Sequence, residues 1–371
     1  MLSQKSGLCE KAAYIIERRN DAGSWQGEAA CTIDASGCLV FPGLIDFHTH
    51  IFHEGSGICI HPDLMIANGV TATCDAGSSG CMNYGAFHQT TVVPGIMKVK
   101  SFLNVYSGGQ LCHAFDEILD VKRFDEDGIA RTIEKYRDFI LGLKIRIPKT
   151  IVGSGEQGLE PLKRTVAIAK EIGQRLRVAV HVTDGPVDAE RIAEVLRPGD
   201  IFAHCFHGKG DTIIGNDGHV LPGILEARKR GVLFDVANGK GNFDIRIAKM
   251  ALEDGFLPDI ISSDMTPDKY NMPPYCKNLP LILSKFLALG MPLEEIISRT
   301  TEIPASVMDM GDRIGTLKEE YAADVAIFKL RDQDVLHKDW QDEEFTSHQL
   351  LVPQLTMCDG VIQFCQTDFF N

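Results

Sequence analysis

Short runs of apolar residues recur along the chain, and each run ends on a polar residue. Apolar runs of this length, bounded by polar and turn residues, predict buried strands of a parallel sheet. The predicted strands are Leu39–Phe47, Val70–Cys74, Val99–Leu103, Leu141–Ile145, Leu176–Val180, Ile201–Ala203, Val232–Phe234 and Ile260–Ile261.

Segments with helical periodicity lie between the later strands. The predicted helices are Gly158–Ile172, Asp188–Leu196, Pro222–Arg230, Arg246–Asp254 and Leu279–Leu289. Asp188 and Pro222 are residue types that begin helices, and glycine stands just beyond several of the predicted ends. Alternation of strand and helix over most of the chain predicts an α/β fold, a (β/α)8 TIM barrel. An open doubly wound sheet is the alternative, but no Gly-x-Gly-x-x-Gly turn follows the first strand.

The polar residues at the strand ends favour the barrel. They are His48 and His50, Asp75, Asn104, Lys144 with Arg146, His181, His204, Asp235 and Asp264. In a barrel the carboxyl ends of all strands converge on one mouth, where such enzymes place their chemistry. An open sheet would spread the same residues along its edge.

Both ends of the chain have a different pattern. Residues 1–40 and 313–371 contain short extended pieces, such as Ala30–Ile33, Asp324–Phe328 and Val361–Phe364. We expect these two parts to form a small β subdomain beside a barrel domain that spans residues 41–312. The charged stretch Arg331–Glu344 reads as a solvated excursion.

Composition excludes several classes of protein. A formal charge of −14 and the lack of a basic patch argue against nucleic acid and anionic membranes as partners. There is neither an apolar segment near Met1 of signal-peptide length nor a Cys-x-x-Cys pair among the 11 cysteines. We therefore expect a cytoplasmic enzyme with reduced thiols, a small-molecule substrate and a homo-oligomeric state. Cys205 is expected to be a packing residue.

A metal site is the chemistry that the strand ends indicate. His48 and His50 are separated by one residue in a strand, so they point to the same side. Neutral imidazole binds zinc and similar first-row ions. The alternative is that one histidine packs in the core and the other lies in a loop. His181 and His204 at later strand ends favour the metal site, and Asp264 could bind a metal or cap a helix.

Lys144 is unusual among such residues because an ammonium group repels cations. Its position in the apolar strand Leu141–Ile145 favours the neutral amine, which reacts with carbon dioxide to form a carbamate. A carbamate resembles an extended carboxylate and can bridge two metals. The alternative is a lysine that extends to the surface.

These motifs together resemble the amidohydrolase superfamily of binuclear metal hydrolases, and within it the deacetylase-like branch. The resemblance runs from Thr32 to Phe328. The motifs that carry it are Pro-Gly-Leu-Ile-Asp-Phe-His-Thr-His (42–50), Gly-Val-Thr-Ala-Thr-Cys-Asp-Ala-Gly-Ser-Ser-Gly (69–80), Gly-Leu-Lys-Ile-Arg (142–146), His181, His-Cys-Phe-His-Gly-Lys (204–209), Gly-Phe-Leu-Pro-Asp-Ile-Ile-Ser-Ser-Asp (255–264) and the segment 315–328.

The resemblance implies a role for each metal ligand. His48 and His50 would hold the more buried of two divalent ions and His181 and His204 the more exposed one, with zinc as the expected metal. Carbamylated Lys144 would bridge the ions. Asp264 would bind the first ion and act as general base.

The chain departs from the family pattern at three places. Glu17–Gly27 is irregular where relatives have clear strands, which implies a reduced β subdomain. Ala237-Asn238-Gly239 replaces a glycine-histidine-glycine turn, and we expect Asn238 to face the substrate. Phe52 stands where dihydroorotases carry an arginine that holds a carboxylate, which argues against dihydroorotase activity.

The predicted reaction is hydrolysis of an amide (N-acyl) or ester bond by a metal-bridging hydroxide, with Asp264 as base and then acid. Arg146 is a candidate to hold a substrate carboxylate, although a structural ion pair explains it equally well.

A deaminase of a purine-like substrate is one alternative, weakened by the presence of Lys144 and by the absence of a glutamate beside His181. An inactive scaffold is another, weakened because all six ligand positions are filled. His207 is expected to lie outside the ligand set. No role is predicted for His53, His61, His88, His113, His219, His337 and His348.

Overall fold

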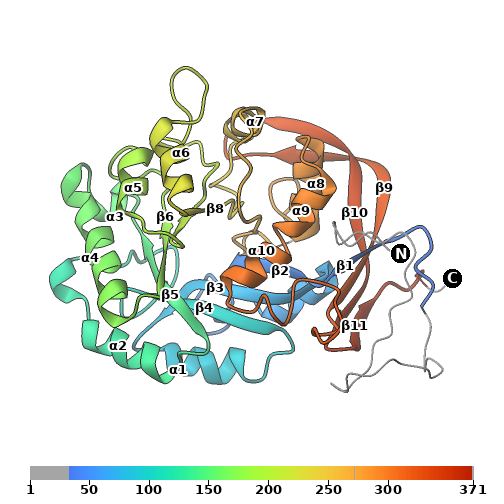
Figure 1. The fold of residues 1–371 in the computed structure, drawn as a ribbon, viewed down its shortest axis with the longest axis horizontal. Helices are drawn as coiled ribbons and strands as arrows, with labels where there is room; N and C mark the ends of the chain where they lie inside the picture. Colours follow the sequence, from blue (N-terminus) through green and yellow to red (C-terminus); the bar gives the residue numbers. More distant parts are fainter. Residues whose placement is uncertain (1–32, 271, 370–371) are drawn as a thin grey trace.

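The computed structural model describes residues 33–270 and 272–369. Its centre is a parallel sheet with the strand order β2-β3-β4-β5-β6-β7-β8 (Figure 1). Every strand lies beside its neighbour in the sequence, as in a barrel. The strands are β2 (Leu44–Thr49), β3 (Val70–Gly80), β4 (Lys98–Asn104), β5 (Ile140–Arg146), β6 (Arg177–His181), β7 (Ile201–Ala203) and β8 (Leu233–Asp235).

An extended segment, Ile260–Met265, closes this sheet into a barrel. Its first residue forms a parallel bridge with Asp235 at the end of β8, and its last forms one with Thr49 at the end of β2. The backbone amide of Asp264 also donates to the carbonyl of His48 at 2.7 Å. The predicted (β/α)8 barrel is confirmed, with this segment in the place of its eighth strand.

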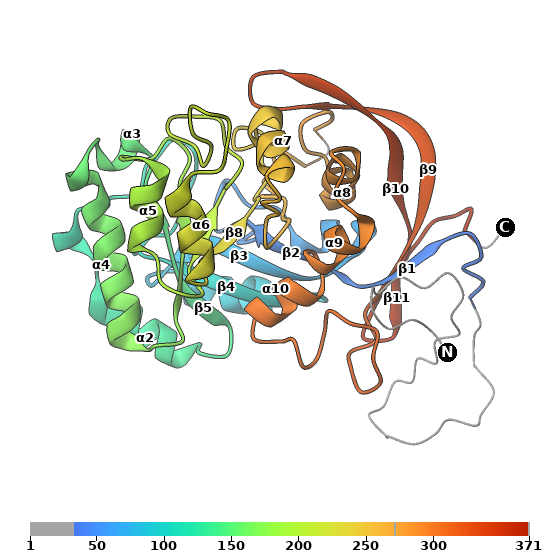
Figure 2. The same ribbon diagram turned by 45° about the horizontal axis from the view of Figure 1, so that its top comes forward.

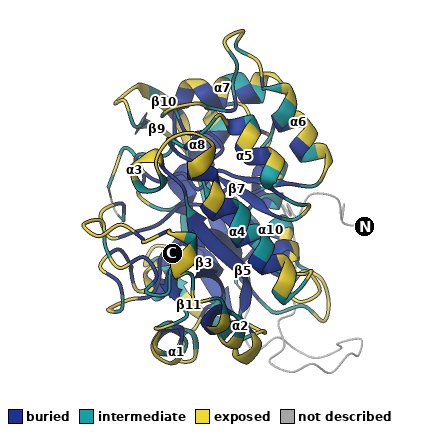
Figure 3. Cartoon of the chain, turned by 90° about the vertical axis from the view of Figure 1, so that its left-hand side faces the viewer, coloured by how far each residue is buried: buried dark blue, intermediate teal, exposed yellow. Residues whose placement is uncertain are grey.

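Helices cover the outside of the barrel, and Figure 3 shows that the strands inside are buried while the outer faces of the helices are exposed. The five predicted helices are confirmed, with ends that differ by no more than two residues. They are α4 (Glu156–Ile172), α5 (Ala189–Val195), α6 (Pro222–Lys229), α7 (Ile245–Glu253) and α8 (Leu279–Ala288). Shorter helical elements are α1 (Tyr84–Phe87), α2 (Glu126–Lys135), α3 (Lys149–Val152), α9 (Leu293–Ser298), α10 (Glu302–Val307), η1 (Pro62–Asn68), η2 (His88–Val92) and η3 (Val121–Arg123). None of the helices in the described ranges has the length and apolarity of a transmembrane span.

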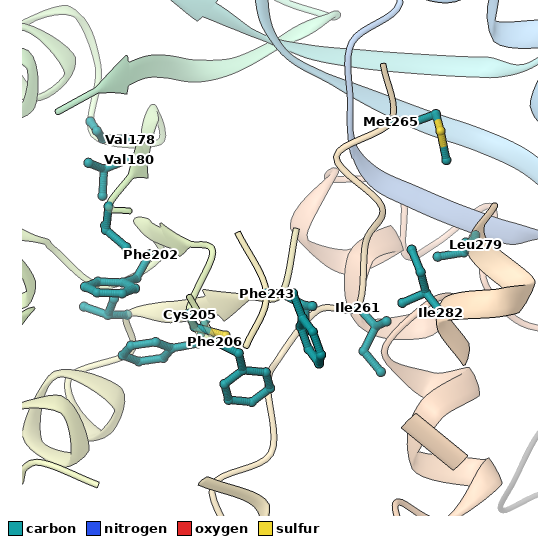
Figure 4. Packing of buried hydrophobic residues seen from close by; sticks show 14 of the residues in the cluster. Val178, Val180, Phe202, Cys205, Phe206, Phe243, Ile261, Met265, Leu279 and Ile282 are labelled. Atoms are coloured by element: carbon teal, nitrogen blue, oxygen red, sulfur yellow. The ribbon is translucent and has the colours of Figure 1, made fainter. Parts of the chain in front are cut away.

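The hydrophobic core lies between the strands and these helices. Phe202 on β7 packs against Phe234 on β8, with ring centroids 5.3 Å apart. Figure 4 shows Phe243 and Ile261 on the far side of this core, next to Ile282 of α8. This packing holds the ends of the strands, and the side chains beyond them, in fixed positions.

A second sheet is antiparallel and has the strand order β1-β9-β10-β11. Its strands are β1 (Leu39–Pro42), β9 (Val325–Lys338), β10 (Glu344–Cys358) and β11 (Val361–Cys365). The single strand predicted over Leu39–Phe47 is therefore two strands in two sheets, divided at Gly43. A Cβ at Gly43 would lie 2.1 Å from Thr71 Oγ1, so only glycine allows the chain to pass between the sheets here. The prediction for Ala30–Ile33 and Glu17–Gly27 lies outside the described residues, except for Ile33.

The β9–β10 hairpin is long and curves over α7 and α8 (Figure 2). Most side chains of Arg331–Glu344 are exposed, as predicted for a solvated excursion, although the stretch is also regular, forming the outer half of β9 and the tip of the hairpin. His337 and Asp339 are buried, and Asp339 Oδ2 accepts a hydrogen bond from the Ile245 amide at 3.0 Å. The inward residues of the hairpin thus pack on the barrel helices while its charged residues face outward.

Candidate metal centre

His48 and His50 lie at the carboxyl end of β2 and are both buried. His48 Nδ1 is 2.9 Å from Asp235 Oδ2, and His50 Nδ1 is 2.9 Å from Ser78 Oγ. Each ring therefore has its Nδ1 occupied by an oxygen of the protein. A histidine held in this way presents Nε2 as a ligand with a fixed orientation.

Asp264 faces the same point from the segment that closes the barrel. Its Oδ1 is 3.4 Å from His50 Nε2 and 3.9 Å from His48 Nε2. The candidate ligand atoms of these three residues all lie within 4.8 Å of one another. This arrangement of two imidazoles and a carboxylate fits a divalent first-row ion.

Lys144 points from β5 toward this cluster. Its Nζ is 3.2 Å from His48 Nε2, and only 1% of the residue is exposed. Burial lowers the pKa of Lys144 to about 8, although the nearby Asp264 and Asp235 carboxylates act in the opposite direction. The neutral amine that forms a carbamate is therefore accessible near neutral pH.

His181 and His204 complete the arrangement from β6 and the end of β7. Their ring centroids are 4.4 Å apart, and the ring of His204 is 5.2 Å from that of His48. His204 Nδ1 is 2.9 Å from the carbonyl of Ala237, which leaves Nε2 available. Burial lowers the pKa of His204 to about 3 and lowers those of His48 and His181 as well. All three rings are thus held in the neutral form that binds metals.

Two of these residues have left-handed backbone conformations. The φ angle is +67° at His204 and +52° at Asp264. Residues other than glycine rarely adopt such angles, and each costs about 1–3 kcal/mol that the surrounding fold must offset. In this barrel the turns direct both side chains into the mouth.

Asp235 is not a candidate ligand, but its contact with His48 Nδ1 holds that ring in place. Burial raises the pKa of Asp235 to about 7, while hydrogen bonds from Ser262 Oγ and the Ala237 amide favour the carboxylate. Asp75 acts in a similar way on β3, where it accepts hydrogen bonds from Ser78 Oγ at 2.7 Å and from the Ile51 amide at 2.9 Å. Both were visible in the sequence as polar strand ends, but only their contacts show that they orient the histidines.

A cavity of about 540 Å³ opens at the barrel mouth. All six residues predicted as metal ligands line it: His48, His50, Lys144, His181, His204 and Asp264. Arg146 lines it too, and its Nη1 forms an ion pair with Glu117 Oε2 at 2.8 Å. His113 lines it as well, although the strand pattern predicted no role for it.

Asn238 takes a position other than the predicted one. It is fully buried, does not line the cavity, and its Oδ1 accepts a hydrogen bond from Lys285 Nζ at 2.9 Å. His207 is buried outside the cavity. Cys205 is also buried, and burial raises the pKa of its thiol well above the usual value, as a packing residue requires.

Two residues that the sequence did not single out contact Asp264. Lys269 Nζ is 2.6 Å from Asp264 Oδ2, and Asn242 Nδ2 donates to the same oxygen at 3.2 Å. Lys269 follows Asp264 by five residues in a loop, and Asn242 comes from the preceding loop of the barrel. No spacing rule connects them to the site, so only the fold shows their contact.

The family model that matches this chain is described as "Amidohydrolase family", and it covers residues 39–362. The chain belongs to the amidohydrolase family. It is a metal-dependent hydrolase that acts on C–N bonds, and its barrel mouth is the place where this fold carries its chemistry.

The proteins that are similar to this chain have different names. A protein from Agrobacterium fabrum named deacetylase is 34% identical over 307 residues, which are 82% of this chain and 73% of the relative. A deacetylase from Brucella anthropi is 33% identical over 324 residues, 87% of this chain and 79% of the relative. Among solved structures, one described as a dihydroorotase has 31% identity and a TM-score of 0.79 over 92% of this chain and 88% of its own. One described as an adenine deaminase has 27% identity and a TM-score of 0.82 over 93% of this chain and 92% of its own.

Proposed function

We propose that this amidohydrolase uses two divalent metal ions to hydrolyse an amide (N-acyl) or ester bond in a small molecule. The observation that carries the proposal is the meeting of four imidazoles, one buried lysine and one aspartate at a single cavity. Lys144 favours two ions, because a lysine carbamate is needed only where it bridges a pair of metals.

The donor set fits two ions. His48, His50 and Asp264 would hold one, His181 and His204 the other, and Lys144 as a carbamate would bridge them. Zinc suits this mixture of imidazole and carboxylate ligands. When bound, the ions would polarise the scissile carbonyl and lower the pKa of a water molecule at the site.

Asp264 is the proposed general base. Its Oδ1 faces the histidines, while its Oδ2 is held by Lys269 and Asn242. A carboxylate fixed through one oxygen keeps the other in position to accept a proton from the attacking water. The same oxygen then delivers the proton to the leaving nitrogen or oxygen.

The relatives named deacetylase support an acyl group as the part that is cleaved. Phe52 argues against dihydroorotase activity, because its buried ring packs on Phe87 with centroids 5.4 Å apart and cannot hold a carboxylate. Deamination of a purine-like compound is the second candidate, on the basis of the adenine deaminase structure.

The test combines metal content with activity. We expect about two ions per chain in protein purified without chelators, and a loss of metal and about a 1,000-fold lower kcat/KM in Lys144→Ala. Substrates would be a panel of N-acyl amino acids, acylated hydroxy acids, cyclic amides and aminopurines. Lys100→Ala is the matched control, because Lys100 lies on the neighbouring strand β4 and does not line the cavity.

Three results would contradict the proposal. Fewer than about one ion per chain in the wild type would exclude the two-metal site. Full activity and metal content in Lys144→Ala would exclude the carbamate. Turnover confined to aminopurines would favour the deaminase instead.

A further inference from the structure

The cavity mouth carries more positive charge than the protein as a whole. The chain has a formal charge of −14, but besides Lys144, the proposed carbamate, the residues that line the cavity include four lysines and arginines and three aspartates. Cations that line a cleft attract anions from solution when no carboxylate of the protein pairs with them. The partners of these four cations therefore decide where an anion can bind.

Lys209 and Lys240 differ from the other lining cations because they have no carboxylate partner. Arg146 is paired with Glu117, and Lys269 with Asp264. Within the described ranges, Lys209 and Lys240 form no ion pair, and each lies against an aromatic ring instead. Lys209 Nζ is 5.1 Å from the centre of the Trp340 ring, and Lys240 Nζ is 4.6 Å from that of Tyr275.

An aromatic ring attracts an ammonium group but supplies no counter-charge. The N–H groups of such a lysine that point away from the ring remain available for an anion. Asp184, a lining carboxylate in the loop after β6, is already paired with Lys149 at 2.7 Å. Lys209 and Lys240 are therefore two cations at the mouth that form no ion pair within the described ranges.

The position of Lys209 is built into the fold. The preceding residue is Gly208, where a Cβ would lie 2.1 Å from Asp244 Oδ2 and 2.5 Å from Trp340 Nε1. Asp244 Oδ2 in turn accepts a hydrogen bond from Trp340 Nε1 at 2.9 Å. The hairpin tip is thus packed directly on the backbone beside Lys209, and it fixes Trp340 as one wall of the cavity.

The loop after β8 connects this place with the proposed base. A Cβ at Gly239 would lie 2.7 Å from Asp264 Oδ2, and a Cβ at Gly241 would lie 3.3 Å from Lys209 Nζ. Two residues of backbone span at most about 7 Å. The Lys209 ammonium group therefore lies within about 16 Å of Asp264 Oδ2, a span that a small molecule can bridge.

We propose that Lys209 and Lys240, with Trp340 as a wall, form a subsite for a second anionic group at the distal end of the substrate. The substrate class is an acylated small molecule with a carboxylate remote from the scissile bond, of which N-acetylglutamate is the simplest probe. The carbon chain of the substrate would pack on the Trp340 ring while its distal carboxylate accepts hydrogen bonds from the lysines. This inference rests on the proposed hydrolase function.

The kinetic test compares N-acetylglutamate with N-acetylglutamine, in both enantiomers. The two compounds have the same shape, but only the first has a distal charge. We expect kcat/KM to favour N-acetylglutamate by about tenfold or more, and the preference to disappear in Lys209→Met and Lys240→Met. Rates with N-acetylglutamine should fall less than those with N-acetylglutamate in both variants. Lys229→Met, which removes an exposed lysine of α6 outside the cavity, is the control for net charge.

A binding measurement separates failure of this subsite from failure of the proposed function. Titration calorimetry of the metal-loaded enzyme would compare glutarate with glutaramate, its monoamide. Tighter binding of glutarate by about tenfold, lost in Lys209→Met, supports the subsite even if no N-acyl compound is hydrolysed. Equal binding of the two probes, or equal kcat/KM for the two substrates, overturns the subsite and leaves the hydrolase function standing.

Discussion

At the scale of single residues, the site depends on buried lysine and histidine side chains, because burial lowers their pKa values and favours their neutral forms. Desolvation lowers the pKa of Lys144 to about 8, and it keeps the rings of His48 and His204 neutral. A surface lysine would be almost wholly charged at neutral pH. Lys144 can therefore react with carbon dioxide where a surface lysine reacts very little.

This protonation predicts the pH dependence of reactivation. With a pKa of about 8, about a tenth of Lys144 is neutral at pH 7, against about three in ten thousand for an unperturbed lysine. Because only the neutral amine forms the carbamate, the fraction able to react rises with pH. Chelator-stripped enzyme, given metal at a fixed concentration of dissolved carbon dioxide, should regain activity about tenfold faster at pH 7 than at pH 6.

The same curve should level off above about pH 8, where most of the amine is neutral. Reactivation rates would be measured from the return of hydrolysis over time. A rate that does not depend on pH, or one that still climbs near pH 10, would show that Lys144 does not control reactivation.

At the scale of elements, the β9–β10 hairpin joins the second sheet to the barrel mouth through Asp244. One oxygen of this side chain caps α7, where it accepts hydrogen bonds from the amides of Arg246 at 2.9 Å and Ile247 at 3.1 Å. The other oxygen holds Trp340 at 2.9 Å and Gln341 at 3.2 Å. A single carboxylate thus stabilises a helix end and positions a wall of the cavity.

Asp244→Ala should therefore lower both stability and substrate affinity. Loss of the cap and of the buried hydrogen bonds should cost about 2–4 kcal/mol of unfolding free energy, and the loosened Trp340 should raise KM more than it lowers kcat. Denaturant unfolding and steady-state kinetics would measure the two effects.

Asp188→Ala is the matched control because Asp188 caps α5 through the Arg191 amide and touches no part of the cavity. It should cost about 1 kcal/mol and leave KM unchanged. An unchanged KM in Asp244→Ala would show that the hairpin tip does not position the substrate.

At the scale of the whole molecule, the second sheet and the barrel share one core. Phe328 on β9 packs on Phe41 with ring centroids 5.7 Å apart, and its ring fills the space beside Gly69 of the barrel. Further contacts cross the same boundary, such as the hydrogen bond from Thr356 Oγ1 to the Ile66 carbonyl at 2.7 Å. The sheet therefore stabilises the barrel on which the site depends.

Phe328→Ala should destabilise both parts together. Removal of this buried ring should cost about 3–5 kcal/mol, and loss of activity and loss of far-ultraviolet circular dichroism should shift to the same lower temperature. Phe115→Ala, at a residue that is 69% exposed, should change neither midpoint. Activity that outlasts a first unfolding step would show that the sheet unfolds independently of the barrel.

The strand ends show how far the sequence by itself determined this protein. Alternation of apolar runs with helical segments depends on local spacing, so it predicted the barrel and its main helices. The six candidate ligands were recognisable because imidazole, carboxylate and a buried lysine amine have chemistry of their own. A residue at the carboxyl end of a barrel strand lies at the barrel mouth, so its position in the sequence was enough to place it there.

Only the tertiary structure decided which distant segments meet. The division of one apolar run at Gly43 depends on Thr71, and the burial of His337 and Asp339 within a charged, mostly exposed stretch depends on the helices beneath them. Asn238 turns to Lys285, and Trp340 reaches the mouth from almost the end of the chain. These contacts join residues far apart in sequence, and their energies come from packing and hydrogen bonds between elements, which no local pattern records.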